Sequence, residues 1–387
     1  MPSKPYSSSH EVTQGGLRLL VANWMDPWNP KAGGAEKHFY ELFTRLARRG
    51  HSVTLIASGF EGGEPVVERD GITVHRVGTR HTFAIPAVLL ARRLLAEWPF
   101  SLFIEDLNKV PLYADLWSPI PTFVLVHHIW GRAAFSAAGF PVAALTWLSE
   151  ALIPRLYRKA RFIAVSESTR TDLVIRGIPR HRVAVIPNAA PPPAAPATES
   201  GKDPVPLFVY LGRLQRYKRV DLLMQAAVEL AREGREFKMV IAGSGPEEEA
   251  LQRLASELGV ATRVEFPGFV PEEDKPGLFR RAWANVLMSE KEGWGLTVLE
   301  AAVESTCSVV AAAPGLWDAV VPGETGLWVP YGETRSLAEA LRRLMDAPAE
   351  VERLGRNALA RARAWDWDQA ADRLERALRE AIPPGAP

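Results

Sequence analysis

The sequence predicts an α/β protein with two Rossmann-like domains, because short apolar strands alternate with amphipathic helices in two successive series along the chain. The first series ends at Pro187, and the second begins at Leu207 after a proline-rich segment. A chain of 387 residues, 47% of them hydrophobic, can bury two cores of ordinary size. We therefore expect two facing, doubly wound parallel sheets with a cleft between them.

The first series opens with a strand, a helix and a second strand, which is the βαβ unit of a doubly wound sheet. One face of the helix carries Phe39, Leu42, Phe43 and Leu46, and this spacing predicts that the face packs on the sheet. The expected bounds of the unit are 17–22, 35–49 and 52–57, and further strands are expected at 102–104, 123–126, 162–165 and 183–186.

A linker separates the two series, because residues 189–206 are rich in proline and poor in large apolar side chains. We place the N-terminal domain at 1–190, the linker at 191–205 and the C-terminal domain at 206–364. The last segment, 365–387, is expected to be helical. Strands of the second domain are expected at 207–211, 238–242, 263–266, 286–288 and 309–311.

Charge and cysteine content exclude several classes of protein. Lys and Arg number 46 and Asp and Glu 45, so the net charge of +1 offers no electrostatic reason to expect nucleic acid as a partner. The lone cysteine, Cys307, excludes an intrachain disulfide and a metal site built from cysteines. These properties favour a cytoplasmic protein.

The N-terminal segment, 1–11, is polar and lacks an apolar core, so we expect it to be disordered rather than a signal peptide or a membrane span. The longest apolar stretches, 83–95 and 140–153, are too short to cross a bilayer. Both lie near cations: Arg92, Arg93, Arg155, Arg158 and Lys159. These segments either pack in the core with extended arginines or form a basic amphipathic surface that contacts the inner face of a membrane.

The segment from Ser289 to Glu300 carries the strongest functional signal. It follows an apolar strand, 283–288, and a helix is expected to begin at Gly295 or Leu296. Ligands bind at this edge of a parallel sheet, and the N–H groups at the start of a helix suit a diphosphate. Glu292 and Glu300 flank that position, and as acceptor-only groups they suit sugar hydroxyls. Alternatively, both are solvated glutamates at a helix start, but the surrounding Gly-Trp-Gly favours a ligand site.

Arg213 and Lys218 lie on the loop that follows the first strand of the second domain. Two cations on such a loop can converge on one anion, and their place at the carboxyl end of a strand favours this over a solvated basic loop. In the first domain, Gly33 and Gly34 allow a ligand to approach the backbone before a helix, or form an ordinary turn. That loop has no Gly-x-Gly-x-x-Gly motif, which disfavours a nicotinamide dehydrogenase. His127 ends a strand and is either a structural or a site histidine.

These motifs resemble the family 4 retaining glycosyltransferases, which are of the group 1 type and have the GT-B fold. The family pattern of Glu, Gly, aromatic, Gly, a short apolar run and Glu stands here as Glu292-Gly293-Trp294-Gly295-Leu296-Thr297-Val298-Leu299-Glu300. Its Gly-Arg-Leu and following Lys stand as Gly212-Arg213-Leu214 and Lys218. Further matches, in the family's order, span nearly the whole chain.

The resemblance assigns roles to these residues. It implies that Glu292 contacts the donor sugar, that Glu300 contacts the ribose, and that Arg213 and Lys218 bind the donor diphosphate. It also places the glycine pair near phosphate and acceptor, His127 near the transferred sugar, and the backbone of Phe269 and Val270 at the nucleobase. It implies an acceptor-side first domain, a donor-binding second domain and a C-terminal helix that packs back on the first. The expected donor-binding residues are Gly33, Gly34, Arg213, Lys218, Phe269, Val270, Glu292, Gly293, Trp294, Gly295, Leu296 and Glu300, and the expected catalytic residues are His127, Arg213, Lys218 and Glu292.

The implied function is the transfer of a sugar from a UDP- or GDP-linked donor to an unidentified acceptor, such as a glycan or a lipid-linked glycan. We expect no cofactor and no metal, because cations and helix N–H groups can stabilise the departing diphosphate. Asp366 and Asp368 resemble the Asp-x-Asp metal motif of another glycosyltransferase fold, but they begin the last helix and we interpret them as a helix cap.

The sequence departs from the family pattern at Ser305 to Ser308, where relatives usually have Gly-Thr-Pro-Val. We expect this change to reshape the turn into the next strand, which bears on the turnover rate and the choice of donor, and to leave the phosphate and ribose contacts in place. A nucleotide-sugar epimerase shares the architecture but needs acidic and histidine residues arranged for proton abstraction, which we do not find. A module that binds a nucleotide sugar without transferring it also stays open.

Overall fold

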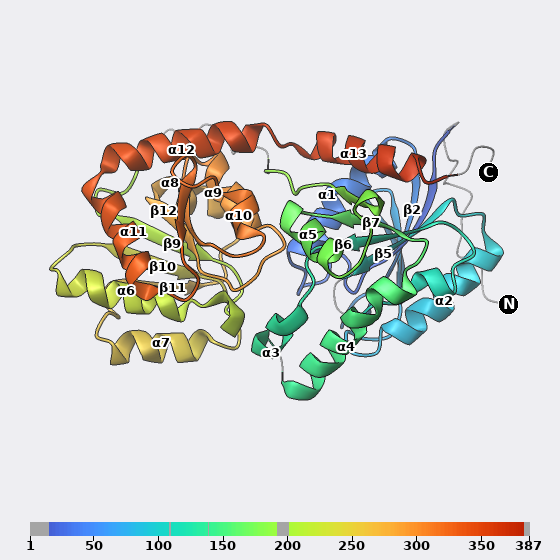
Figure 1. The fold of residues 1–387 in the computed structure, drawn as a ribbon, viewed down its shortest axis with the longest axis horizontal. Coiled ribbons are helices and arrows are strands. Elements are labelled where there is room, and N and C mark those ends of the chain that lie inside the picture. Colours follow the sequence, from blue (N-terminus) through green and yellow to red (C-terminus); the bar gives the residue numbers. More distant parts are fainter. Residues whose placement is uncertain (1–14, 108–109, 138, 192–200, 383–387) are drawn as a thin grey trace. The chain divides into compact units, whose positions relative to one another are not determined.

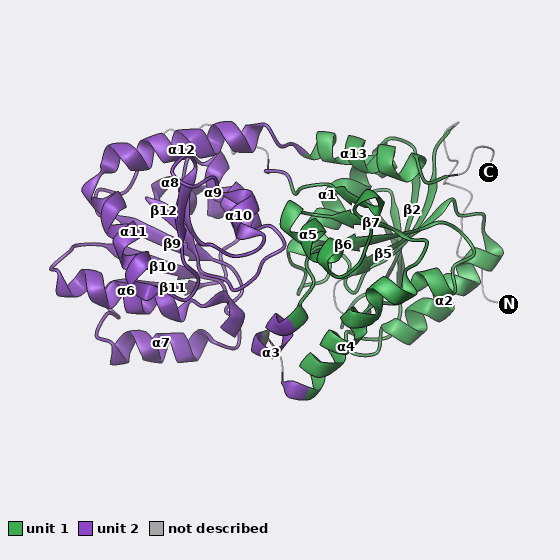
Figure 2. Cartoon of the chain, viewed as in Figure 1, with its two compact units in different colours: residues 1–131, 141–188, 367–387 green, residues 132–140, 189–366 purple. Residues whose placement is uncertain are grey.

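The computed structural model describes residues 15–107, 110–137, 139–191 and 201–382, and it divides into two compact units (Figure 2). Unit 1 comprises residues 1–131, 141–188 and 367–387, and unit 2 comprises residues 132–140 and 189–366. The division differs from the expected boundaries in that residues 132–140 group with unit 2. The N-terminal segment 1–11 and most of the expected linker lie outside the described residues.

Unit 1 contains an eight-stranded sheet in the order β3-β4-β2-β1-β5-β6-β7-β8 (Figure 1). All neighbouring strands are parallel except β3 and β4. The strand order reverses between β1 and β5, which is the topological switch point where open sheets bind ligands. The strands are β1 (Arg18–Ala22), β2 (Ser52–Ala57), β3 (Val66–Arg69), β4 (Ile72–Arg76), β5 (Leu102–Leu107), β6 (Thr122–Val126), β7 (Arg161–Ala164) and β8 (Val183–Val185).

Helices cover both faces of this sheet. The helix that follows β1 covers one face, and those that follow β4 and β6 cover the other, as right-handed crossovers in opposite directions require. On the second face, Leu20 and Phe103 pack with the helix after β4, and Val124 packs with Ile153 of the helix after β6. The helices are α1 (Gly34–Arg48), α2 (Ala84–Glu97), η1 (Ala114–Leu116), α4 (Phe140–Leu156), α5 (Glu167–Ile175), η3 (Arg180–Arg182) and α13 (Trp367–Arg379).

The C-terminal helix α13 packs on α1 within unit 1. Its apolar face buries Ala371, Leu374 and Leu378, as the sequence spacing predicts. Around that contact, Arg45 pairs with Asp368 over 3.1 Å and Arg49 pairs with Asp372 over 2.8 Å. The carboxylate of Asp368 therefore helps to hold two helices together.

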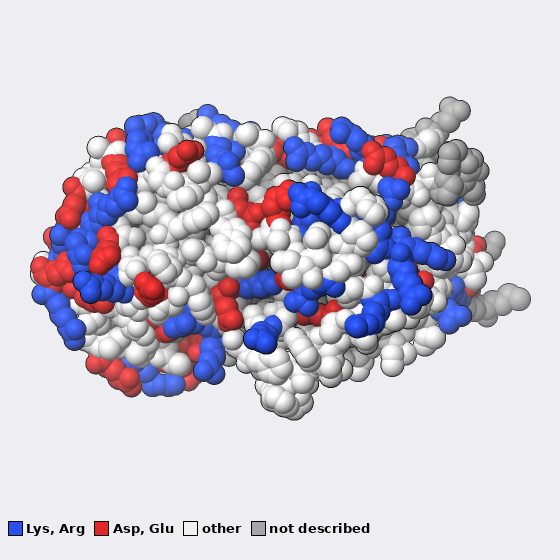
Figure 3. All heavy atoms as spheres, in the orientation of Figure 1, with Lys and Arg blue, Asp and Glu red and all other residues white. Residues whose placement is uncertain are grey.

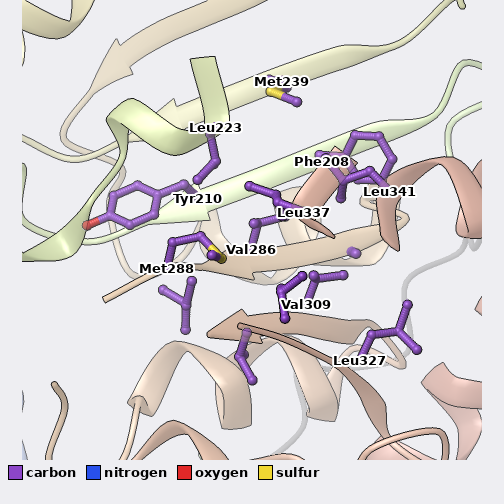
Figure 4. Close-up of a cluster of buried hydrophobic side chains, with 14 of the residues drawn as sticks. Phe208, Tyr210, Leu223, Met239, Val286, Met288, Val309, Leu327, Leu337 and Leu341 are labelled. Atoms are coloured by element: carbon purple, nitrogen blue, oxygen red, sulfur yellow. The ribbon is translucent and has the colours of Figure 1, made fainter. Parts of the chain in front are cut away.

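Unit 2 contains a six-stranded, wholly parallel sheet in the order β11-β10-β9-β12-β13-β14. Side chains from its central strands and from the covering helices interlock in one core (Figure 4). The elements of unit 2 are η2 (Gly131–Ala133), α3 (Ala134–Ala137), β9 (Leu207–Leu211), η4 (Arg216–Lys218), α6 (Asp221–Arg232), β10 (Lys238–Ala242), α7 (Glu248–Glu257), β11 (Val264–Gly268), α8 (Lys275–Arg281), β12 (Ala284–Leu287), α9 (Leu296–Val303), β13 (Cys307–Ala311), α10 (Leu316–Ala319), β14 (Gly326–Val329), α11 (Thr334–Asp346) and α12 (Pro348–Arg363).

Three strands were not expected from the sequence: β3, β4 and β14. The hairpin of β3 and β4 turns at Asp70 and Gly71, whose φ angles of 51° and 78° are those of the Asp-Gly turns that join such hairpins. Since β3 is four residues long and largely exposed, it lacks the apolar run by which the other strands are recognised. Within the described ranges, no helix combines the length and the apolar character needed to cross a membrane.

Candidate functional site

Three loops at the carboxyl edge of the unit 2 sheet are tied together by backbone hydrogen bonds. β9 and β12 are neighbours in the sheet, so the loops that follow them meet. The N–H of Glu290 donates to the carbonyl oxygen of Tyr217 over 2.9 Å, and that of Glu292 donates to the carbonyl oxygen of Pro314, after β13, over 3.1 Å. Because ligands bind at this edge of a parallel sheet, the three loops form a candidate site with a fixed backbone.

Lys218 and Glu292 form an ion pair across two of these loops. The ammonium group of Lys218 donates to Oε1 of Glu292, and the hydroxyl of Ser289 donates to the same oxygen over 2.6 Å. The two paired side chains are 14% and 15% exposed. Burial lowers the pKa of Lys218, but the Glu292 carboxylate outweighs it and raises this pKa above its ordinary value. Lys218 is therefore a permanent cation, and neither bond uses Oε2 of Glu292.

The backbone of the loop that carries Arg213 is held by the sheet, whereas Arg213 itself is exposed. The hydroxyl of the buried Tyr210 donates to the carbonyl oxygen of Arg213 over 2.9 Å. A Cβ at Gly243 would lie 1.9 Å from the carbonyl oxygen of Gly212, and one at Gly245 would lie 2.2 Å from that of Leu214. The turn after β10 thus supports this loop by close backbone packing.

The expected helix start after the Glu292 loop is present. α9 begins at Leu296, and Gly295 precedes it with a φ of 86°, a conformation that side chains other than glycine rarely adopt. Gly315, with a φ of 85°, packs against the loop so closely that a Cβ there would lie 2.2 Å from the carbonyl oxygen of Glu292. The N-terminus of α9 thus opens at the sheet edge beside the ion pair, where an anion is favoured.

The other expected donor-binding residues of unit 2 differ in exposure. Trp294 is 4% exposed and its ring packs against Trp365 at a centroid distance of 4.9 Å, so the indole belongs to the core rather than to a ligand surface. Glu300 lies in α9 and is 9% exposed, whereas Phe269, just after β11, is 74% exposed. Gly293 and Trp294 belong to the same loop as Glu292, and Gly295 and Leu296 form the start of α9.

In unit 1, the glycine pair stands at the start of α1. Gly33 is the residue before the first helical turn, and its N–H donates to Oε2 of Glu36 over 2.7 Å. Glu36 is 2% exposed, and burial raises the pKa of its carboxyl group. One of the N–H groups expected to face a phosphate is therefore already bonded to a carboxylate, which was not foreseen from the sequence.

His127 lies in a buried polar cluster at the switch point of the unit 1 sheet. Its Nε2 atom is 3.1 Å from Oδ1 of Asp106 in β5, and its carbonyl oxygen accepts a hydrogen bond from Thr169 over 3.0 Å. The ring of His38, from α1, packs edge-on against that of His127 with centroids 5.1 Å apart. The carboxylate of Glu36, also from α1, raises the pKa of His127.

The two histidines of the cluster have opposite charge preferences. Burial lowers the pKa of His127, but the carboxylates of Asp106 and Glu36 outweigh burial and raise it above its ordinary value. Burial and the neighbouring His127 together hold the pKa of His38 well below its ordinary value. The cluster therefore holds one imidazole that favours the charged form beside one that stays neutral.

Sequence reasoning identified His127 but missed Glu36, His38 and Asp106. The signal for Asp106 is a pair of acidic residues in an otherwise apolar strand, which was expected to end at residue 104. His38 carried no signal, because it lies next to Phe39 in a helix with an ordinary apolar face. Among the described residues, no group of three or more His, Cys, Asp or Glu is placed to hold a metal ion.

The departure at Ser305 is accommodated by the backbone. Ser305 has a φ of 56°, in the left-handed region that glycine favours, and its carbonyl oxygen contacts Gly355 so closely that a Cβ there would lie 2.1 Å away. Cys307 is buried in β13, where burial raises the pKa of its thiol to about 12. The turn therefore keeps a glycine-like conformation, and the thiol is protonated.

Comparison with known proteins gives two family matches. The model described as Glycosyltransferase Family 4 matches residues 32–192, and the model described as Glycosyl transferases group 1 matches residues 197–361. The D-inositol 3-phosphate glycosyltransferase of Frankia alni is 36% identical over 189 residues, which are 46% of this chain and 46% of that protein. The chain thus spans about half the length of the first curated relatives that it matches.

Solved structures match almost the whole chain at low identity. Sucrose-phosphate synthase from Thermosynechococcus elongatus has a TM-score of 0.79 at 20% identity, over 94% of this chain and 98% of that one. Anabaena HepE, in complex with UDP and glucose, has a TM-score of 0.74 at 18% identity, over 94% of this chain and 100% of that one. These likenesses and the two parallel-sheet units establish the GT-B fold.

Proposed function

We propose, because the chain belongs to the group 1, family 4 glycosyltransferases, that it transfers a sugar from a nucleoside diphosphate sugar to an acceptor hydroxyl. The observation that carries the proposal is the Lys218 and Glu292 pair beside the N-terminus of α9. It combines a cation and helix N–H groups for a diphosphate with a carboxylate for sugar hydroxyls. The solved complex of HepE with UDP and glucose supports a UDP-linked donor, and a GDP-linked donor is the second choice.

In the proposed reaction, the bond between C1 of the sugar and the diphosphate oxygen breaks, and its electron pair leaves with the nucleoside diphosphate. An acceptor oxygen forms the new bond to C1 and gives its proton to the departing phosphate. Negative charge grows on the leaving group, so donors already held there lower the barrier most. We assign this role to Arg213, Lys218 and the N–H groups at the start of α9.

The carboxylates and His127 position the sugar in this proposal. Oε1 of Glu292 is occupied by Lys218 and Ser289, which leaves Oε2 to accept from a sugar hydroxyl. Glu300 serves the ribose, and His127, fixed by Asp106, donates to the transferred sugar. Retention of the anomeric configuration and independence of metal are carried over from the family resemblance, and the acceptor is a glycan or a lipid-linked glycan.

The experiment that tests the proposal follows UDP- and GDP-sugars by ³¹P and ¹H NMR, with and without a pool of glycans, sugar phosphates and lipid extract, and with and without EDTA. Release of nucleoside diphosphate that the pool accelerates, unchanged by EDTA, is the expected result. An isomerised sugar on an intact diphosphate would identify an epimerase instead. A donor that binds, as judged by line broadening, but stays intact with every pool would identify a binding module.

A further inference from the structure

Helix α4 exposes an apolar stripe on the side that faces away from the core of unit 1. The opposite side packs inward through Ala143 and Ile153, which are 0% and 1% exposed. A helix that is apolar all round is normally buried, so an outward stripe of this kind marks a contact surface. The outward residues follow one another at helical spacing and are Val142 (60% exposed), Leu145 (60%), Leu148 (55%) and Leu152 (43%).

Helix α2 extends this surface. It covers the same face of the sheet as α4, and it exposes Ile85 and Leu89 at 73% and 64%. The turn η1 bridges the two helices, since Ala114 packs with the core beneath α2 and Tyr113 packs on Tyr157 beside α4. We call the outward residues Ile85, Leu89, Val142, Leu145, Leu148 and Leu152 the α2–α4 surface.

The charges next to the α2–α4 surface are mostly positive. Arg92 and Arg93 follow Leu89 on the exposed side of α2, where Arg93 pairs with Glu97 over 2.7 Å, and Arg155 and Arg158 follow Leu152. The single acidic residue of α4, Glu150, is 2% exposed and turns inward to accept the N–H groups of Trp130 and Gly131, each over 2.7 Å. In Figure 3, the surface over the start of α4 is uncharged, and Lys and Arg gather toward its other end.

We propose that the α2–α4 surface docks on an anionic phospholipid bilayer. An apolar stripe flanked by cations matches the boundary of such a bilayer, where acyl chains lie below a layer of phosphates. Trp147, which is 43% exposed beside the stripe, is the residue type that settles at this boundary. A second copy of the chain fits less well, because a self-complementary contact would bring the same arginines against one another.

Co-sedimentation of the full chain with vesicles tests this proposal independently of sugar transfer. We expect binding to mixed phosphatidylglycerol and phosphatidylcholine vesicles at least about tenfold tighter than to phosphatidylcholine alone, weakened by salt. The triple variant Leu145→Ser, Leu148→Ser and Leu152→Ser should lose binding by about tenfold or more. The matched control is Ile175→Ser on α5, which removes an apolar side chain that is 79% exposed elsewhere in unit 1.

The double variant Arg155→Glu and Arg158→Glu should lose the preference for anionic vesicles, whereas Arg335→Glu in unit 2 should keep it. Circular dichroism and an unchanged melting temperature confirm that each variant is folded. Equal binding to neutral and anionic vesicles, or unchanged binding of the triple serine variant, would overturn the proposal. Sedimentation equilibrium that shows a dimer dissolved by the serine substitutions would also overturn it and assign the surface to a second copy.

Discussion

The Nε2 atom of His127 lies 3.1 Å from Oδ1 of Asp106, and both side chains are buried where β5 and β6 end. Asp106 thereby fixes the imidazole and, with Glu36, keeps its pKa above the ordinary value in spite of burial. The pair joins two strands that are neighbours in the sheet. It gives His127 a defined orientation at the carboxyl end of β6, as the proposed contact with the transferred sugar requires.

We predict that Asp106→Asn lowers the pKa of His127, because only the carboxylate of Glu36 then opposes the effect of burial. A histidine with a raised folded pKa stabilises the protein fully below its unfolded pKa, and this contribution is lost as pH rises through the folded value. The variant should therefore lose most stability below about pH 6.5 and approach the parent at alkaline pH. Melting temperatures of the parent and of Asp106→Asn, measured from acid to alkaline pH, check this prediction, and Asp70→Asn at an exposed position is the control. A loss of stability that does not depend on pH would contradict it.

The ion pair in unit 2 predicts that Glu292→Gln separates binding from turnover. The substitution removes the charge that partly neutralises Lys218. The affinity for a nucleoside diphosphate should therefore stay unchanged or rise a few-fold, which corresponds to a gain in binding free energy of about 1 kcal/mol or less. Turnover should fall at least about tenfold, because an amide is a poorer acceptor for sugar hydroxyls. Calorimetry and NMR rates measure the two effects. Loss of nucleotide binding without loss of turnover would show that Glu292 acts on the phosphate side.

Gly315 and Gly332 offer a matched pair for the packing of the Glu292 loop. Their φ angles are 85° and 81°, but a Cβ at Gly315 would lie 2.2 Å from the carbonyl oxygen of Glu292, whereas one at Gly332 meets nothing within 4 Å. Gly332→Ala should cost only the conformational strain, about 1 to 2 kcal/mol. Gly315→Ala should cost more and also weaken nucleoside diphosphate binding by displacing Glu292.

Urea unfolding of both variants, with nucleotide binding measured in parallel, checks this difference. Equal destabilisation and equal nucleotide affinity in the two variants would show that the close approach at Gly315 does not position the loop.

A buried carboxyl group in unit 1 predicts a pH dependence of stability. Glu105 accepts from the hydroxyl of Tyr157 over 2.6 Å and from the N–H groups of Leu112 and Ala114, yet burial raises its pKa from 4.5 to about 7. The folded state then holds a proton that the unfolded state releases, so stability falls between about pH 4.5 and pH 7, by about 3 kcal/mol in all. The denaturant midpoint of the parent, minus that of the Glu105→Gln variant, should fall as the pH rises through this range. A flat difference would mean that Glu105 is ionised in the folded state.

Much of the fold follows from the sequence, because most of the buried strands carry their own apolar run. Bounds at β2, β9 and β10 agree with the sequence-based expectation, and the glycine before α9 is where helix geometry calls for one. The exposed β3 was missed because an edge strand paired by its backbone needs no apolar run. The buried strands β4 and β14 were missed as well, because polar residues or a glycine interrupt their apolar pattern.

Contacts within the candidate site were less predictable. Lys218 and Glu292 were assigned separately to phosphate and sugar, and their pairing depends on β9 lying next to β12, although β10 and β11 come between them in sequence. The same holds for Asp106 and His127, on neighbouring strands. Strand order is set by the packing of the whole sheet, so no local sequence pattern predicts which strand ends will lie next to each other.

The measurement that tests the central claim most directly is calorimetric titration of the full chain with UDP, GDP and other nucleoside diphosphates. The parent is compared with Arg213→Ala, Lys218→Met and Glu300→Ala, and Arg216→Ala serves as a control on the same loop. We predict that one nucleoside diphosphate binds the parent and the control equally, and that affinity falls by about tenfold or more in the three variants. Binding of no nucleoside diphosphate, or binding that all three variants retain, would contradict a donor site at the carboxyl edge of the unit 2 sheet.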